Sequence, residues 1–72
     1  MCINNCKIGK VYTIKSLDVK PSLRVRLMAI GMYEGCRIEI LYSSQSNFVI
    51  KFNRSTFAFR KNDLKNVKVD TI

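Results

Sequence analysis

The sequence predicts a mainly β fold, a small and partly open barrel of about five strands with one helix after the first strand. Apolar and polar residues alternate over 36–42 and 48–52, which is the period of half-buried strands. Helical spacing occurs only over 21–30. A chain of 72 residues is expected to form one domain, 1–72, and so small a sheet hides its apolar face from water by curling.

The first predicted strand leads into the helix. Residues 10–17 are rich in Val, Tyr, Thr and Ile, as strands are, and Gly9 predicts the turn before them. Pro21 suits the first position of a helix, where its missing N–H costs nothing. One helical stripe, at i, i+4 and i+7, is expected to face the barrel: Leu23, Leu27 and Ile30. Gly31 follows where a left-handed C-terminal cap is expected.

A hairpin is expected after the helix. One face of the strand over 36–42 is predicted to hold Cys36, Ile38, Ile40 and Tyr42, and the other face Arg37, Glu39 and Leu41. The polar residues 43–47 predict the hairpin loop. The next strand carries Phe48, Ile50 and Phe52 on one face.

Three further elements complete the prediction. Residues 53–55 predict a turn before a short strand with Phe57 and Phe59. Asn62 is expected to cap a helical turn that holds Leu64. Alternation over 67–69 predicts the last strand.

The charge balance indicates an anionic partner. The chain has 13 Lys and Arg against five Asp and Glu, a net charge of +8. Such a protein suits nucleic acid, an anionic lipid surface or an acidic protein, and charge alone does not choose among them. The cations are scattered rather than gathered in one run, which favours a solvated basic surface that attracts an acidic protein or the anionic inner leaflet.

Catalysis is not expected. The chain has no His, which is the commonest general base and metal ligand. It has no paired carboxylates, nucleophile–base arrangement or Gly-rich phosphate loop. No apolar run is long enough to span a bilayer, and the N-terminus lacks the apolar region of a signal peptide. We therefore expect a non-catalytic cytoplasmic protein.

The three cysteines are expected to be reduced thiols. Cys2, Cys6 and Cys36 are an odd number without a secretion signal, unlike a disulfide scaffold. Structural zinc normally takes four N or S ligands, and no Asp or Glu lies near Cys2 and Cys6 in the sequence. We therefore expect no cofactor and no metal site, with metal binding by these thiols left open.

Several stretches resemble the FeoA family, small cytosolic proteins of bacterial ferrous iron uptake. The longest spans residues 27–41, LMAIGMYEGCRIEIL, where the family shows a helix ending in Leu-Gly, a small apolar residue, a Pro-Gly turn and an alternating strand. Residues 54–61 are similar to its Gly-x-x-Leu-Ala-Leu-Arg strand, 21–27 to its helix start and 67–69 to its last strand. The resemblance covers most of the chain, from about Lys10 to Val69.

The resemblance implies an SH3-like barrel that binds the cytosolic part of FeoB, the membrane transporter with a G-protein domain. It implies neither catalysis nor membrane insertion. The chain departs from the family pattern twice. Glu34 stands where the family usually has Pro, which makes the turn less rigid, and Ser43–Asn47 replace a longer Pro-Leu-Gly-Asp-Pro hairpin.

A second apolar face of the helix is the candidate binding site. Val25, Met28 and Ala29 fall opposite the core stripe, and Met32 is expected to continue their row past the helix end. Met suits such a surface because its flexible thioether adapts to a partner. The partner-binding residues are predicted to be Arg24, Val25, Met28, Ala29, Met32 and Tyr33, with Arg24 and Arg26 pairing acidic groups at the rim. The alternative is that loops or the N-terminal segment cover Val25 and Met28.

A second function also stays open. Small basic barrels bind RNA or other nucleic acids when their aromatic side chains face outward. Most of the Phe residues alternate with polar residues in predicted strands, which favours a place in the core. Nucleic-acid binding is therefore the alternative to a protein partner, and weak self-association is compatible with either.

Overall fold

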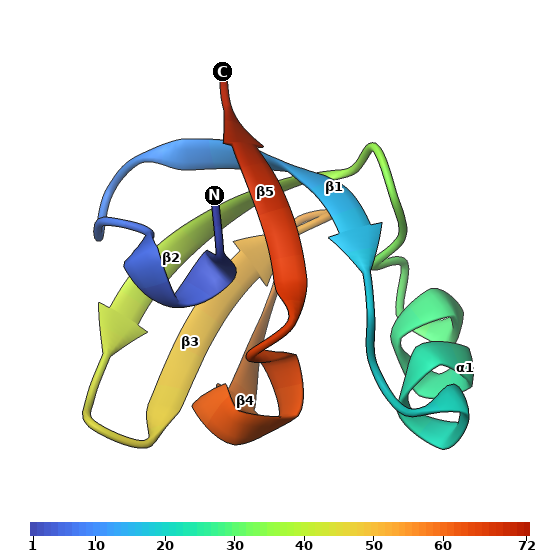
Figure 1. The fold of residues 1–72 in the computed structure, drawn as a ribbon. Coiled ribbons are helices and arrows are strands. Elements are labelled where there is room, and N and C mark those ends of the chain that lie inside the picture. The colour runs from blue at the N-terminus through green and yellow to red at the C-terminus, as the bar shows by residue number, and fades with distance from the viewer.

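One antiparallel sheet includes every strand of the chain (Figure 1). The computed structural model describes residues 1–72. The strands lie in the order β4-β3-β2-β1-β5. Their bounds are β1 (Val11–Leu17), β2 (Arg37–Ser43), β3 (Asn47–Phe52), β4 (Ser55–Arg60) and β5 (Val67–Thr71). The sheet is curved but not closed, since β4 and β5 remain its two edges.

Short helices connect or flank these strands. Helix α1 (Pro21–Ala29) joins β1 to β2 and lies beside one end of the sheet (Figure 1). The 3-10 turn η1 (Ile3–Asn5) precedes β1, and η2 (Lys61–Leu64) joins the two edge strands. The predicted fold, mainly β with one helix after the first strand, is confirmed.

The core lies on the concave side of the sheet. Alternating residues of β1, β2, β3 and β5 point inward, as the period of two requires. The buried set is Ile3, Tyr12, Ile14, Leu17, Leu27, Met32, Ile38, Ile40, Phe48, Ile50, Phe52, Leu64, Val67 and Val69. All of these residues are hydrophobic, and no buried side-chain polar atom lacks a hydrogen-bond partner.

Bulges in two strands explain where the alternation fails. The register shifts between Ile14 and Ser16 in β1, and between Ile40 and Tyr42 in β2. A bulge adds one residue to a strand and turns the following side chain to the other face. The prediction that Tyr42 faces the core with Ile40 is therefore wrong, and its side chain is exposed.

The N-terminal segment packs against the edge strand β5. Cys2 pairs with Lys68, and the Val69 N–H donates to the Met1 carbonyl at 2.7 Å. Ile3 is fully buried beneath this contact. Met1 and Cys2 thus cover part of one sheet edge, whereas the outer side of β4 carries no further strand.

The predicted cap of the second helical turn is wrong. Asn62 lies inside η2, whose N-terminal cap position is Arg60, and no side chain donates or accepts a capping hydrogen bond there. The turn is held instead by Leu64, which is fully buried in the core.

Candidate protein-binding surface

The end of helix α1 decides which apolar side chains face solvent. Gly31 has φ +96°, a left-handed conformation that costs glycine little. The Met32 N–H donates to the Leu27 carbonyl at 2.8 Å, and the Gly31 N–H donates to the Met28 carbonyl at 3.1 Å. These two bonds form a Schellman motif, in which the residue after glycine turns back onto the last helical turn.

The inner face of α1 is the one that the sequence predicted. Leu27 is buried, and Leu23 and Ile30 are half-buried and pack against the core. Their shared face follows from the spacing of three and four residues along the helix. The predicted core stripe is therefore confirmed.

The opposite face of α1 is open to solvent. Val25 is 68% exposed and Met28 is 56% exposed, and Ala29 beside them is exposed as well. The N-terminal segment packs on β5 and not on this helix, so the alternative that it covers Val25 and Met28 is wrong. A nine-residue helix thus presents apolar side chains on two faces and buries only one of them in its own chain.

Met32 does not belong to this exposed row. Its side chain is 0% exposed, and it is part of the core beside Leu27. The prediction that Met32 continues the row of Met28 is wrong, because helical periodicity ends at Gly31 and the Schellman motif directs the next side chain inward.

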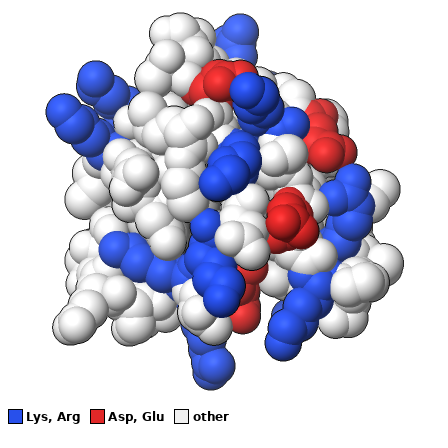
Figure 2. All heavy atoms as spheres, viewed as in Figure 1, with Lys and Arg blue, Asp and Glu red and all other residues white.

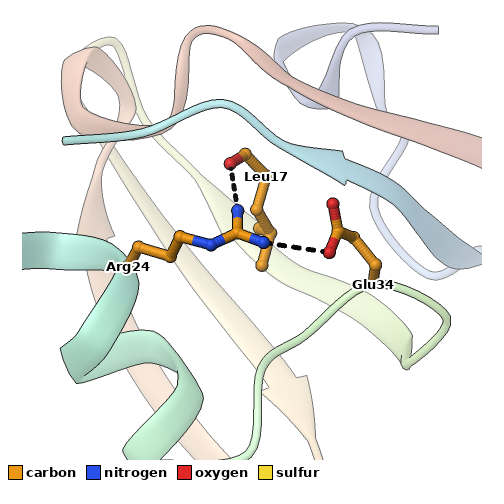
Figure 3. Close-up of polar contacts among 3 residues, drawn as sticks. All are labelled: Leu17, Arg24 and Glu34. Atoms are coloured by element: carbon orange, nitrogen blue, oxygen red, sulfur yellow. Dashed lines mark hydrogen bonds and ion pairs between the residues drawn. The ribbon is translucent and has the colours of Figure 1, made fainter. Parts of the chain in front are cut away.

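Arg24 is held by its own chain. Its Nη1 donates to the Leu17 carbonyl at 2.7 Å, and its Nη2 lies 3.1 Å from Oε1 of Glu34 (Figure 3). This fork ties α1 both to the end of β1 and to the loop before β2. Arg24 is predicted to pair with acidic groups of a partner at the rim, and in this structure it pairs with Glu34 of its own chain. The neighbouring Arg26 is exposed without an ion pair.

Tyr33 extends the exposed surface beyond the helix. It lies in the loop directly after the Schellman motif, and its side chain is exposed. It lines a hollow of about 270 Å³ together with Cys36, Arg37 and Asn53. The structure thus leaves Val25, Met28, Ala29 and Tyr33 available to a partner.

A groove between α1 and the edge strand β4 has no counterpart in the sequence prediction. Its volume is about 400 Å³, and its lining includes Leu23, Arg26, Ile30, Phe57, Phe59 and Arg60. Periodicity assigns these apolar residues to the core, but the sheet ends at β4 and no further strand covers them. An apolar side chain of a partner would fit between the two arginines at the rim.

Cations cover the surface without forming a single block. Figure 2 shows Lys and Arg over all parts of one face, with few acidic side chains among them. The chain forms one ion pair, between Arg24 and Glu34. The other cations have no ion-pair partner in the chain, and their charge attracts an anionic partner at long range.

The thiols do not gather into a metal-binding cluster. No three side chains among His, Cys, Asp and Glu lie close enough to hold an ion. The Cys2 thiol donates to the Lys65 carbonyl at 3.0 Å. Burial, with a smaller contribution from neighbouring Cys2, raises the pKa of the Cys6 thiol to about 11. None of the helices has the length and apolarity needed to cross a bilayer.

The fold defines a class: small, mainly β, SH3-like proteins with one helix. The FeoA domain family matches residues 1–71, and the chain belongs to that family. A search of curated proteins finds no match.

Solved structures of FeoA proteins have the same fold. The FeoA protein from Chlorobium tepidum superposes with a TM-score of 0.92 at 22% identity, over 100% of this chain and 70% of that one. Iron(II) transport protein A from Clostridium thermocellum superposes with a TM-score of 0.88 at 24% identity, over 100% of this chain and 46% of that one. A FeoA-like protein from Clostridium acetobutylicum superposes with a TM-score of 0.82 at 16% identity, over 100% of this chain and 86% of that one.

Proposed function

We propose that this protein is a non-catalytic accessory protein of ferrous iron uptake that binds the cytosolic part of a FeoB-type transporter. Membership of the FeoA family supports a role in iron transport. The observation that carries the binding proposal is the outer face of α1, where Val25 and Met28 stay exposed although Leu27 on the same helix is buried. An apolar face with no partner in its own chain favours a protein partner.

The surface has the composition of a small protein interface. Val25, Met28 and Ala29 supply apolar contact, Tyr33 adds an amphipathic ring, and Arg26 offers a free cation. The groove beside β4 lies on the other side of Arg26 and can take an apolar anchor. Met28 adapts its shape to the partner, and Arg26 pairs with an acidic group at the rim.

The fixed position of α1 matters for this role. The fork of Arg24 to Leu17 and Glu34 and the Schellman motif hold both ends of the helix surface relative to the sheet. A preorganised surface loses less conformational entropy on binding. Docking changes the transporter only to the extent that the protein binds one of its conformations more tightly than another.

A pull-down tests the proposal. The full chain is immobilised, and the isolated cytosolic part of a FeoB-type transporter is applied with and without guanine nucleotide. We expect retention at physiological salt, with a difference between nucleotide states if docking is conformation-selective. Absence of retention in every nucleotide state would contradict the proposal.

A further inference from the structure

We propose that a basic groove across the first residues of β1 and β2 and the end of β3 binds the phosphate groups of an anionic membrane surface. Arg37, Lys51 and Arg54 line this groove, which has a volume of about 170 Å³. Val11 lies in the same lining and is exposed. This site is separate from the outer face of α1, so the inference goes beyond the proposed transporter contact.

The protein neutralises the cations of the groove only in part. Lys51 lies opposite Glu39 in the sheet register, yet the two form no ion pair. Arg37 and Arg54 make no side-chain hydrogen bond or ion pair at all. Three cations therefore share one concave surface with a single carboxylate. Guanidinium groups in this situation bind phosphate oxygens through paired N–H donors.

Arg54 occupies a position that folding alone would not give to arginine. Asn53 and Arg54 form the two-residue turn between β3 and β4 with φ 51° and 63°. Both values are left-handed, and such hairpin turns favour Asn followed by Gly. The arginine side chain makes no hydrogen bond or ion pair within the chain that would offset the strained backbone. A strained residue that its own fold does not reward points to a role in binding.

A lipid surface fits this groove better than a nucleic acid. Binding of single strands needs exposed aromatic rings on which bases stack. The one aromatic residue in the lining of this groove is Phe52, and it is buried. An exposed aliphatic side chain, Val11, lies beside the cations instead. Apolar side chains next to cations suit the headgroup region of an anionic bilayer.

Vesicle flotation tests the inference with the full chain. Phosphatidylcholine vesicles with and without phosphatidylglycerol are used at physiological salt. We expect binding only with phosphatidylglycerol, and a weakening on the order of 100-fold in the triple variant Arg37→Gln, Lys51→Gln, Arg54→Gln, since each cation contributes about a factor of five. Absence of binding by the unmodified chain would overturn the inference.

A matched control separates this groove from general charge. The variant Lys20→Gln, Lys65→Gln, Lys68→Gln removes the same three charges from exposed positions outside the groove. We expect it to bind phosphatidylglycerol vesicles within about threefold of the unmodified chain. Equal losses in the two variants would mean that the charge acts diffusely and that no groove site exists.

Two further measurements complete the test. Arg54→Gly relieves the left-handed strain, so we expect a higher unfolding midpoint together with several-fold weaker vesicle binding. Filter binding to RNA at the same salt is the other arm, and tighter retention of RNA than of vesicles, lost in the groove variant, would overturn the lipid assignment. The groove variant should still bind the isolated cytosolic part of the transporter, which keeps the two proposals distinguishable.

Discussion

The Nη2 atom of Arg24 lies 3.1 Å from Oε1 of Glu34, an ion pair that ties helix α1 to the loop leading into β2. Glu34 stands where the FeoA pattern described in the sequence analysis has Pro. The predicted loss of rigidity is opposed here, because the carboxylate anchors the loop to a helix residue that also donates to the Leu17 carbonyl. The same link orients the exposed face of α1 relative to Tyr33.

Substitution of Glu34 and substitution of Arg24 should lower the free energy of unfolding by different amounts. Both side chains are partly exposed, so we expect Glu34→Gln to lower the free energy of unfolding by less than about 1 kcal/mol, and by less at high salt. Arg24→Met also removes the bond to the Leu17 carbonyl and should cost about 1–2 kcal/mol. Urea denaturation at two salt concentrations measures both, and equal losses would mean that the Leu17 bond contributes nothing.

The Schellman glycine should be intolerant of a side chain. Gly31→Ala is strained at φ +96° and places its Cβ 3.1 Å from Nδ2 of Asn53, so we expect a loss of about 1–2 kcal/mol in thermal or urea unfolding. Gly35→Ala is the control, since its φ is also left-handed but no atom lies within 4 Å of the added Cβ. A loss at Gly31 no larger than at Gly35 would show that the contact with Asn53 is unimportant.

Two methionines near the helix end should behave oppositely. Met32 is fully buried, so Met32→Ala should cost about 2–4 kcal/mol of unfolding free energy. Met28 is more than half exposed, and Met28→Ala should change stability by less than about 0.5 kcal/mol. Comparable values for the two variants in chemical denaturation would refute the assignment of Met32 to the core and Met28 to the surface.

Much of this arrangement could be predicted from the sequence. The strand segments, the helix and its core stripe follow from apolar spacing, and the predicted C-terminal cap at Gly31 is confirmed. Periodicity fails where the backbone departs from regular geometry. The prediction for Met32 extends helical spacing beyond Ala29, where α1 ends. The prediction for Tyr42 is wrong because a bulge has no reliable signature in residue types.

The binding surface was only partly predictable, for a related reason. Val25 and Met28 face solvent as expected, because their positions on the helix fix their direction. Whether Arg24 is free or engaged depends on Leu17 and Glu34, seven and ten residues away. The α1–β4 groove depends on β4 being the last strand of the sheet, a property of strand order that periodicity does not encode.

Cys6 should make stability depend on pH in the alkaline range. Burial raises the pKa of its thiol from 9.0 to about 11, so the unfolded chain loses this proton before the folded one. Below pH 9 this thiol therefore adds no pH dependence to the free energy of unfolding. As the pH rises from 9 to 11, its ionisation lowers the free energy of unfolding. The urea midpoint should fall less between pH 8 and pH 10.5 in Cys6→Ala than in the unmodified chain. An equal fall in the two proteins would contradict the raised pKa of Cys6.

The central claim is that one helix serves the core with one face and a partner with the other. Isothermal titration of the isolated cytosolic part of a FeoB-type transporter with the unmodified chain, Met28→Asp and the control Ile8→Asp tests it most directly. Ile8 is 57% exposed, as Met28 is 56%, but lies outside the helix. The account predicts at least about 30-fold weaker binding for Met28→Asp, unchanged affinity for Ile8→Asp, and native circular dichroism for both. Full affinity of a folded Met28→Asp variant would contradict the claim.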